Sequence, residues 1–201
     1  KKLFGLLLLA WLALPLVVQG QDWIDLTDAY IVNPRFDNNN LTTGWQGTPF
    51  GMASPHENAE HYSRDFDSYQ VVNRLKPGTY RLSLNAFYRS GGAQDDYNHY
   101  RDDAASYQLA QLYASSQVDE YSTPIALAGS GAVPQGLGGA TSDVWTEGGS
   151  WWGGEGERLV VPNNMDAAYY WFQAGHYHNV LTDIVVGADG VAYFGFFLAL
   201  F

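Results

Sequence analysis

The most regular alternation of hydrophobic and polar positions in this chain lies between residues 79 and 88. Apolar or aromatic side chains occupy every second position, which is the period of a β-strand. One face of the predicted strand carries Tyr80, Leu82, Leu84, Ala86 and Tyr88, and the other carries Arg81, Ser83, Asn85 and Phe87. A turn at residues 75–78, with Pro77 and Gly78, precedes this strand.

Shorter apolar runs between turn residues predict further strands. These runs lie at residues 31–37, 69–72, 107–114 and 122–127, with another short strand opening at Gly44 and Trp45. Residues 180–186 and 191–197 are expected to form a hairpin around a turn at 187–190. Many short strands, with no internal repeat or linker, predict one all-β domain, an antiparallel β-sandwich.

Two segments carry helical signals, so the sandwich is expected to have one or two short helices in its insertions. Residues 162–175 give the clearest helix, with Asn163 or Asn164 as its N-cap and Gly175 after its end. The polar insertion at residues 91–105 is expected to hold a short helix over 95–105. Residues 129–157 are rich in glycine and predict a long loop, a kind of segment that is often functional.

The N-terminal segment has the pattern of a secretory signal peptide. Two lysines precede an apolar run over residues 3–18, and a small residue, Gly20, precedes a polar stretch. A transmembrane anchor is the alternative, but this run is short for a bilayer span and Pro15 interrupts it. We therefore expect a signal peptide at residues 1–20 and a mature domain at 21–201. The protein is then secreted, periplasmic or at the cell surface, with no membrane insertion after cleavage.

Charge and composition narrow the range of partners. Asp and Glu total 21 against 10 Lys and Arg, which gives a net charge of −11. Such a surface repels phosphate backbones, so nucleic acid is not an expected partner. The absence of cysteine excludes disulfides, cysteine-ligated zinc and a thiol nucleophile.

An ordered set of short segments resembles secreted β-sandwich modules of Bacteroidetes-type polysaccharide-degrading proteins. These modules have a galactose-binding-domain-like jelly roll, the fold of many carbohydrate-binding modules, and the resemblance covers roughly residues 23–196. The segments that carry it are Ile31 to Asp37 with Gly44-Trp45, Ala59 to Tyr62, Leu75 to Arg81, Phe87 to Gly91, Val161 to Met165 and Gly175 to Asn179. Such modules close with a further strand that carries a Trp and an Asp-x-Phe-x-Leu-like segment. This chain departs from them at its end, so the domain at 21–201 is expected to lack that C-terminal strand and to leave an apolar sheet edge.

Aromatic side chains in loops are the sequence sign of a sugar site, because flat rings stack on the C–H faces of sugars. Trp145, Trp151 and Trp152, among the glycines of residues 129–157, are the first candidates. The second group comprises Tyr97, His99, Tyr100 and Arg101 in the polar insertion, and Arg89 could bind a hydroxyl or a carboxylate. The alternative for each is a packing role within the domain.

A calcium site is the metal candidate, because similar modules often hold a structural calcium near their first strand. Asp37 and Asn38, with Asn39 and Asn40, offer the clustered oxygen atoms that calcium prefers. The alternative is a plain turn, since Asn-rich loops are usually turns.

Three functions follow, in order of preference. The first is a non-catalytic carbohydrate-binding accessory module of a secreted or cell-surface polysaccharide-utilisation protein, with a polysaccharide or oligosaccharide as partner. The second is a structural or protein-interaction sandwich that packs against a neighbouring domain. The third is a glycan hydrolase or lyase that uses Glu60 with Asp65 or Asp67, although the chain has none of the common catalytic motifs. Exposure of Trp151 and Trp152 beside a cleft would favour the carbohydrate-binding function.

Overall fold

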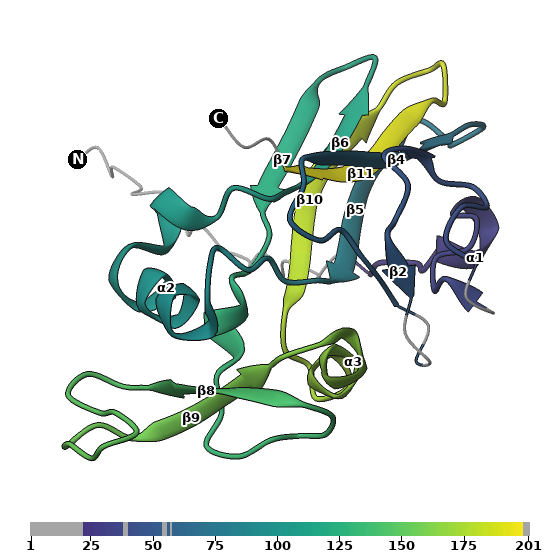
Figure 1. The fold of residues 1–201 in the computed structure, drawn as a ribbon. Helices are drawn as coiled ribbons and strands as arrows, with labels where there is room; N and C mark the ends of the chain where they lie inside the picture. The colour runs from purple at the N-terminus through teal and green to yellow at the C-terminus, as the bar shows by residue number, and fades with distance from the viewer. Residues whose placement is uncertain (1–21, 38–39, 54–55, 57, 199–201) are drawn as a thin grey trace, which may run out of the picture.

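Antiparallel β-strands form most of the regular structure, which a computed structural model describes at residues 22–37, 40–53, 56 and 58–198 (Figure 1). The strands are β1 (Gln46–Gly47), β2 (Met52–Ala53), β3 (Ala59–Glu60), β4 (Phe66–Val72), β5 (Gly78–Asn85), β6 (Gln111–Ser116), β7 (Glu120–Pro124), β8 (Thr141–Trp145), β9 (Arg158–Pro162), β10 (His178–Val186) and β11 (Ala192–Leu198). The helices are α1 (Thr27–Tyr30), α2 (Ala93–Tyr107), the 3-10 helix η2 (Ala128–Gly131) and α3 (Met165–Gln173). A mostly β, antiparallel chain is confirmed, with three α-helices in the described residues where one or two were expected. The predicted signal peptide lies outside those residues.

Two of the sheets share one hydrophobic core. The larger has five strands in the order β1-β4-β11-β6-β7, and the smaller pairs β10 with β5. Leu112 and Phe194 enter the core from the five-stranded sheet, and Leu181 and Ile184 enter it from the two-stranded sheet. Because side chains alternate between the faces of a strand, each sheet keeps a second face that points away from this core.

The alternation predicted for residues 79–88 is confirmed over β5. Tyr80, Leu82 and Leu84 pack against the core, while Arg81 and Ser83 are exposed. The inward side chains of β5 are only half-buried, whereas Leu181 and Ile184 of β10 are buried. The core is therefore less covered beside β5 than beside β10. The expected lack of a further closing strand stays a prediction.

The predicted hairpin of residues 180–186 and 191–197 is wrong. Its turn does form, with the Gly190 amide donating to the Gly187 carbonyl at 3.2 Å, but the two strands belong to different sheets. β10 pairs with β5, and β11 lies between β4 and β6. The turn residues specify a reversal of the chain, whereas the partner of each strand depends on apolar faces supplied from far away in the sequence.

Two other predicted strands also need correction. Residues 31–37 form turns, because Asn33 and Phe36 have left-handed φ values of 52° and 55° that a strand does not allow. The helix predicted at 95–105 is present but longer, so Tyr107 ends α2 and the strand predicted from residue 107 begins only at Gln111.

The helix predicted at 162–175 is confirmed as α3, with Asn164 Oδ1 accepting from the Ala167 amide at 2.8 Å.

The predicted long loop at residues 129–157 contains regular structure. It holds most of η2 and all of β8, and β8 pairs with β9 as a hairpin. Figure 1 shows this hairpin with α2 and α3 at one end of the molecule, below the two sheets that share the core. The alternation of apolar residues in β8 is too short to stand out among the surrounding glycines, and for that reason the strand was missed.

His61 lies in an aromatic cluster at the β4 side of the core. Its ring stacks between Phe50 and Phe66, with ring centroids 4.7 and 4.3 Å away. Nε2 lies 2.9 Å from Ser68 Oγ, which itself donates to the Thr48 carbonyl at 2.6 Å. The hydrogen between His61 and Ser68 must therefore be on Nε2. Nδ1 is buried and has no partner among the described residues, so protonating it would bury an unpaired charge.

Burial, helped by the positive charge of Arg64, lowers the pKa of His61 to about 4. An unfolded histidine takes up its proton near pH 6.5, so the unfolded chain binds more protons than the folded one between pH 6.5 and 4. The free energy of unfolding should therefore fall as the pH drops through this window. Thermal unfolding at constant ionic strength should show a steeper loss of Tm for the wild type than for His61→Gln, which cannot titrate. Parallel profiles for the two proteins would contradict this assignment.

Candidate ligand-binding cleft

An open cleft of about 500 Å³ lies between α2 and the tip of the β8–β9 hairpin. It brings together two segments, the polar insertion and the tryptophan-bearing loop, that the sequence offered as separate candidates. The lining residues are Gln94, Asn98 and Arg101 from α2, Asp143 and Trp145 from β8, and Thr146 to Trp152 from the loop that follows.

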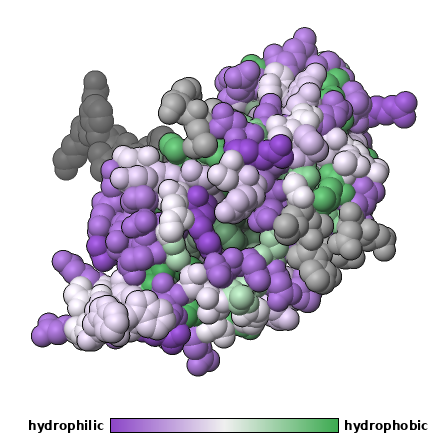
Figure 2. Space-filling view, viewed as in Figure 1, coloured by the Kyte–Doolittle hydropathy of each residue, from purple (hydrophilic) through white to green (hydrophobic). Residues whose placement is uncertain are grey.

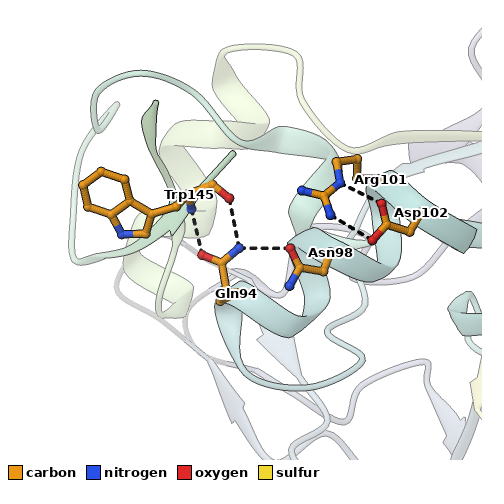
Figure 3. Close-up of polar contacts among 5 residues, drawn as sticks. All are labelled: Gln94, Asn98, Arg101, Asp102 and Trp145. Carbon is orange, nitrogen blue, oxygen red and sulfur yellow. Dashed lines mark hydrogen bonds and ion pairs between the residues drawn. The ribbon is translucent and has the colours of Figure 1, made fainter. Parts of the chain in front are cut away.

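Gln94 fixes the position of the hairpin against α2. Its Oε1 accepts from the Trp145 amide at 2.7 Å, and its Nε2 donates to the Trp145 carbonyl at 3.0 Å. The same Nε2 donates to Asn98 Oδ1 at 3.1 Å, as Figure 3 shows. One side chain thus pairs with the backbone at the end of β8 as a neighbouring strand would, and holds the two walls of the cleft together.

The loop after β8 folds closely on itself, and only glycine permits this. A Cβ on Gly154 would lie 1.9 Å from the Gly148 carbonyl oxygen, and one on Gly156 would lie 2.4 Å from the Gly149 nitrogen. Gly154 also has a φ of +131°, which side-chain-bearing residues rarely adopt. Ser150 Oγ closes the turn by donating to the Gly153 carbonyl at 2.8 Å. The glycines therefore give the loop a defined backbone path.

This backbone path directs two indoles outward. Trp151 is 70% exposed and Trp152 is 97% exposed, the latter being the highest value among the exposed large hydrophobic residues. Trp151 meets Trp145 edge to face, with ring centroids 5.9 Å apart and an interplanar angle of 68°. Trp145 itself is half-buried, and its Nε1 is buried without a partner among the described residues. Figure 2 shows the hairpin end in pale colours of intermediate hydropathy, next to purple polar residues.

Opposite charges are paired at the cleft. Arg101 donates to Asp102 at 2.7 and 2.9 Å, and this hydrogen bonding lowers the pKa of the Asp102 carboxyl (Figure 3). Asp143 forms an ion pair with Arg158 at 2.6 Å, and Glu147 adds a further carboxylate to the lining. The cleft has no excess of positive charge, so its chemistry favours a neutral ligand over a phosphate or sulfate ester.

Tyr97 and Tyr100 do not line the cleft. Tyr97 is buried in a cluster with Val144 and Val161, because η2 packs against this side of α2 and Gly129 contacts the Tyr97 backbone. The structure therefore gives Tyr97 a packing role, which is the alternative stated for it. Tyr100 is 43% exposed on α2 but lies outside the lining.

Arg89 and Asp37 also lie outside the lining of the cleft. Arg89 is half-buried, and its Nη2 donates to the Pro162 carbonyl, which is the structural pairing given as its alternative. Asp37 is exposed, and Asn38 lies outside the described residues. Within the described part of the chain, no group of three His, Cys, Asp or Glu side chains is placed to hold a metal ion.

Ser90, Asp96 and His99 lie together, but not in the order of a catalytic triad. In a triad, the carboxylate orients the histidine and the histidine takes the proton of the serine. Here Asp96 Oδ1 accepts directly from the Ser90 amide at 2.7 Å and from Ser90 Oγ at 2.8 Å. His99 Nδ1 lies 2.8 Å from the same Oγ and must therefore donate to it. This arrangement anchors the start of α2 and leaves the serine without a base.

Gln94 and Asn98 are the cleft residues that the sequence interpretation missed. They stand four positions apart in α2, and Arg101 follows three later, which places all three on one helical face. That spacing was a usable signal once the segment was expected to be helical.

Three comparisons with known proteins found no protein similar to this chain. A scan against protein-family models, a search of curated proteins and a search of solved structures each gave no match. The fold and the cleft are therefore interpreted from their own geometry. Among the described residues, no helix combines the length and the apolar character needed to cross a bilayer.

Proposed function

We propose that this chain is a non-catalytic carbohydrate-binding module of a secreted or cell-surface polysaccharide-utilisation protein, with a jelly-roll β-sandwich fold. One observation carries the proposal: two neighbouring indoles, Trp151 and Trp152, stand exposed at the rim of an open cleft. Large aromatic side chains are rarely left this exposed on a defined loop unless they contact a partner. The hydrophobic core shared by the five-stranded sheet and the β10–β5 sheet supports the sandwich part of the proposal.

The chemistry of the cleft suits a sugar. An indole face can stack on the C–H face of a pyranose ring, and the cleft adds the amide of Asn98, the guanidinium of Arg101 and the carboxylate of Glu147 for hydroxyl groups. The lack of excess positive charge favours a neutral glycan over an acidic one.

The second function, docking of a neighbouring domain, uses the same exposed aromatic surface. Indoles that served as a scaffold would be expected to pack flat against each other or to be enclosed by the fold. Trp151 instead meets Trp145 at 68°, and Trp152 is almost wholly exposed. This arrangement favours a ligand that inserts beside the rings. For the third function, Glu60 and Asp67 lie on β3 and β4, outside the lining of the cleft.

The test is affinity electrophoresis and calorimetry of the mature chain against neutral and acidic polysaccharides. We expect at least one neutral polysaccharide to bind, and Trp151→Ala with Trp152→Ala to weaken that binding by about tenfold or more. Tyr62→Ala is the matched control, because it removes another aromatic ring that is 81% exposed but does not line the cleft. Binding that survives the double substitution unchanged, or no binding to any glycan, would rule out this cleft as a sugar site.

A further inference from the structure

A second aromatic surface lies on the outer face of the five-stranded sheet, the face turned away from the shared core. Its rings alternate with buried residues: Tyr113 stands between Leu112 and Ala114, which are fully buried, and Tyr193 stands between two buried residues of β11. We call the following four residues the sheet-face aromatics: Tyr69 of β4, Tyr113 of β6, and Tyr193 and Phe197 of β11. Tyr193 is 42% exposed, and the other three are half-buried.

Gly195 lies at the centre of this surface and gives it its shape. It pairs with Tyr69 on one side and with Tyr113 on the other. A Cβ on Gly195 would lie 2.9 Å from Cε1 of the Tyr113 ring and 2.7 Å from the Tyr69 Cβ. The Tyr113 ring therefore leans across the glycine, over space that a side chain would otherwise occupy.

Two contacts hold the Tyr113 ring in this position. Its hydroxyl donates to Asp67 Oδ1 at 2.9 Å, which ties β6 to β4 across the intervening strand. Phe197 meets the ring edge to face, with centroids 5.7 Å apart. Tyr193 lies beside Tyr69 with the two rings tilted at 49° and their centroids 5.9 Å apart. The rings are therefore preorganised, and a ligand would not have to order them.

Within the described strands, the polar side chains on this face carry no positive charge. The outward positions of the five strands hold Asp67 and Glu120 as the charged residues, with Gln46, Gln111, Ser115 and Ser122 as neutral ones. A face of this sign repels an anionic partner. An apolar protein partner would have to desolvate the two carboxylates, which is costly when no cation pairs with them. A neutral sugar chain offers C–H faces to the rings and hydroxyl donors to the carboxylates.

We propose that the sheet-face aromatics form a second binding surface, for an extended stretch of a neutral polysaccharide. Tyr69 and Tyr113 lie two strands apart, about 10 Å, so the surface is longer than a single sugar ring. None of the residues that line the cleft belongs to this sheet, so the two surfaces are separate. The inference takes its ligand class from the proposed function and adds a second contact, which raises avidity for a long chain.

The experiment measures retention in gels that contain xyloglucan, galactomannan or laminarin, taken as soluble neutral polysaccharides. The proteins are the wild type, Tyr193→Ala, the Trp151→Ala/Trp152→Ala double variant and the triple variant. We expect Tyr193→Ala to lower retention by about threefold. The triple variant, which combines Trp151→Ala, Trp152→Ala and Tyr193→Ala, should lose the retention that the double variant keeps. Tyr193→Phe keeps the ring and should bind as the wild type does. Val185→Ala controls for loss of an exposed side chain on the other sheet, where Val185 is 38% exposed.

Each outcome separates this surface from the cleft. If the double variant loses binding while Tyr193→Ala binds as the wild type does, the sheet face is not a binding surface and the cleft remains one. If Tyr193→Ala loses binding while the double variant does not, the cleft is excluded and the sheet face is supported. Absence of wild-type retention on every neutral polysaccharide would overturn both. Unfolding temperatures of all variants confirm that they are folded.

Discussion

Replacing Asp96 with alanine is expected to lower the free energy of unfolding by about 3 kcal/mol. Asp96 is 1% exposed, yet both of its carboxylate oxygens are hydrogen-bonded. Oδ1 accepts from the amide and the hydroxyl of Ser90, and Oδ2 accepts from the Gly129 amide at 2.6 Å. Alanine would leave the Gly129 amide buried without a partner, and the amide and hydroxyl of half-buried Ser90 would lose this acceptor. The three hydrogen bonds connect α2 to the segment that follows β5 and to η2. Because α2 forms one wall of the cleft, that wall should become more mobile as well.

Asp95→Ala is the matched control for this prediction. Asp95 precedes Asp96 in the first turn of α2 but is exposed, so its removal should change stability by no more than about 0.5 kcal/mol. Urea unfolding followed by circular dichroism measures both variants. Equal effects of the two substitutions would show that the helix dipole, and not the buried hydrogen bonds, dominates at this position.

The parts of the fold that the sequence predicted are those that depend on local patterns. The alternation at Tyr80, Leu82 and Leu84 places side chains on one face of β5 whatever its partner is. The cap at Asn164 is equally local, because its side chain bonds to an amide three residues later. The pairing of β11 with β4 and β6 was not predictable, because it depends on matching apolar faces that lie far apart in the sequence.

The candidate site was predicted in part for the same reason. The exposure of Trp151 and Trp152 follows from their place among glycines, which provide no core for an indole to enter. The burial of Tyr97 was not predictable, because the packing of η2 against α2 decides which face of the helix is buried. Trp145 was placed in a loop, whereas β8 places it at a strand end that Gln94 can bind. The cleft needs both segments, and no local pattern indicates that they meet.

Replacing Trp171 with alanine is expected to destabilise the chain by about 4 kcal/mol, the largest effect that we predict. Trp171 is fully buried in α3, where it packs with Val160, Ala167 and Tyr177. Its Nε1 donates to the Gly131 carbonyl at 2.8 Å, which joins α3 to η2. Alanine would leave a large cavity and an unpaired carbonyl in the support of the β8–β9 hairpin.

Trp152→Ala is the control, and it also tests the logic of the proposed site. An indole that is 97% exposed contributes little to packing, so its removal should change stability by no more than about 0.5 kcal/mol. Chemical unfolding of the two variants therefore separates a tryptophan that holds the fold from one that is free for a ligand. If Trp152→Ala proved as destabilising as Trp171→Ala, the ring would be a packing residue, and the sugar-binding role of the loop would lose its main support.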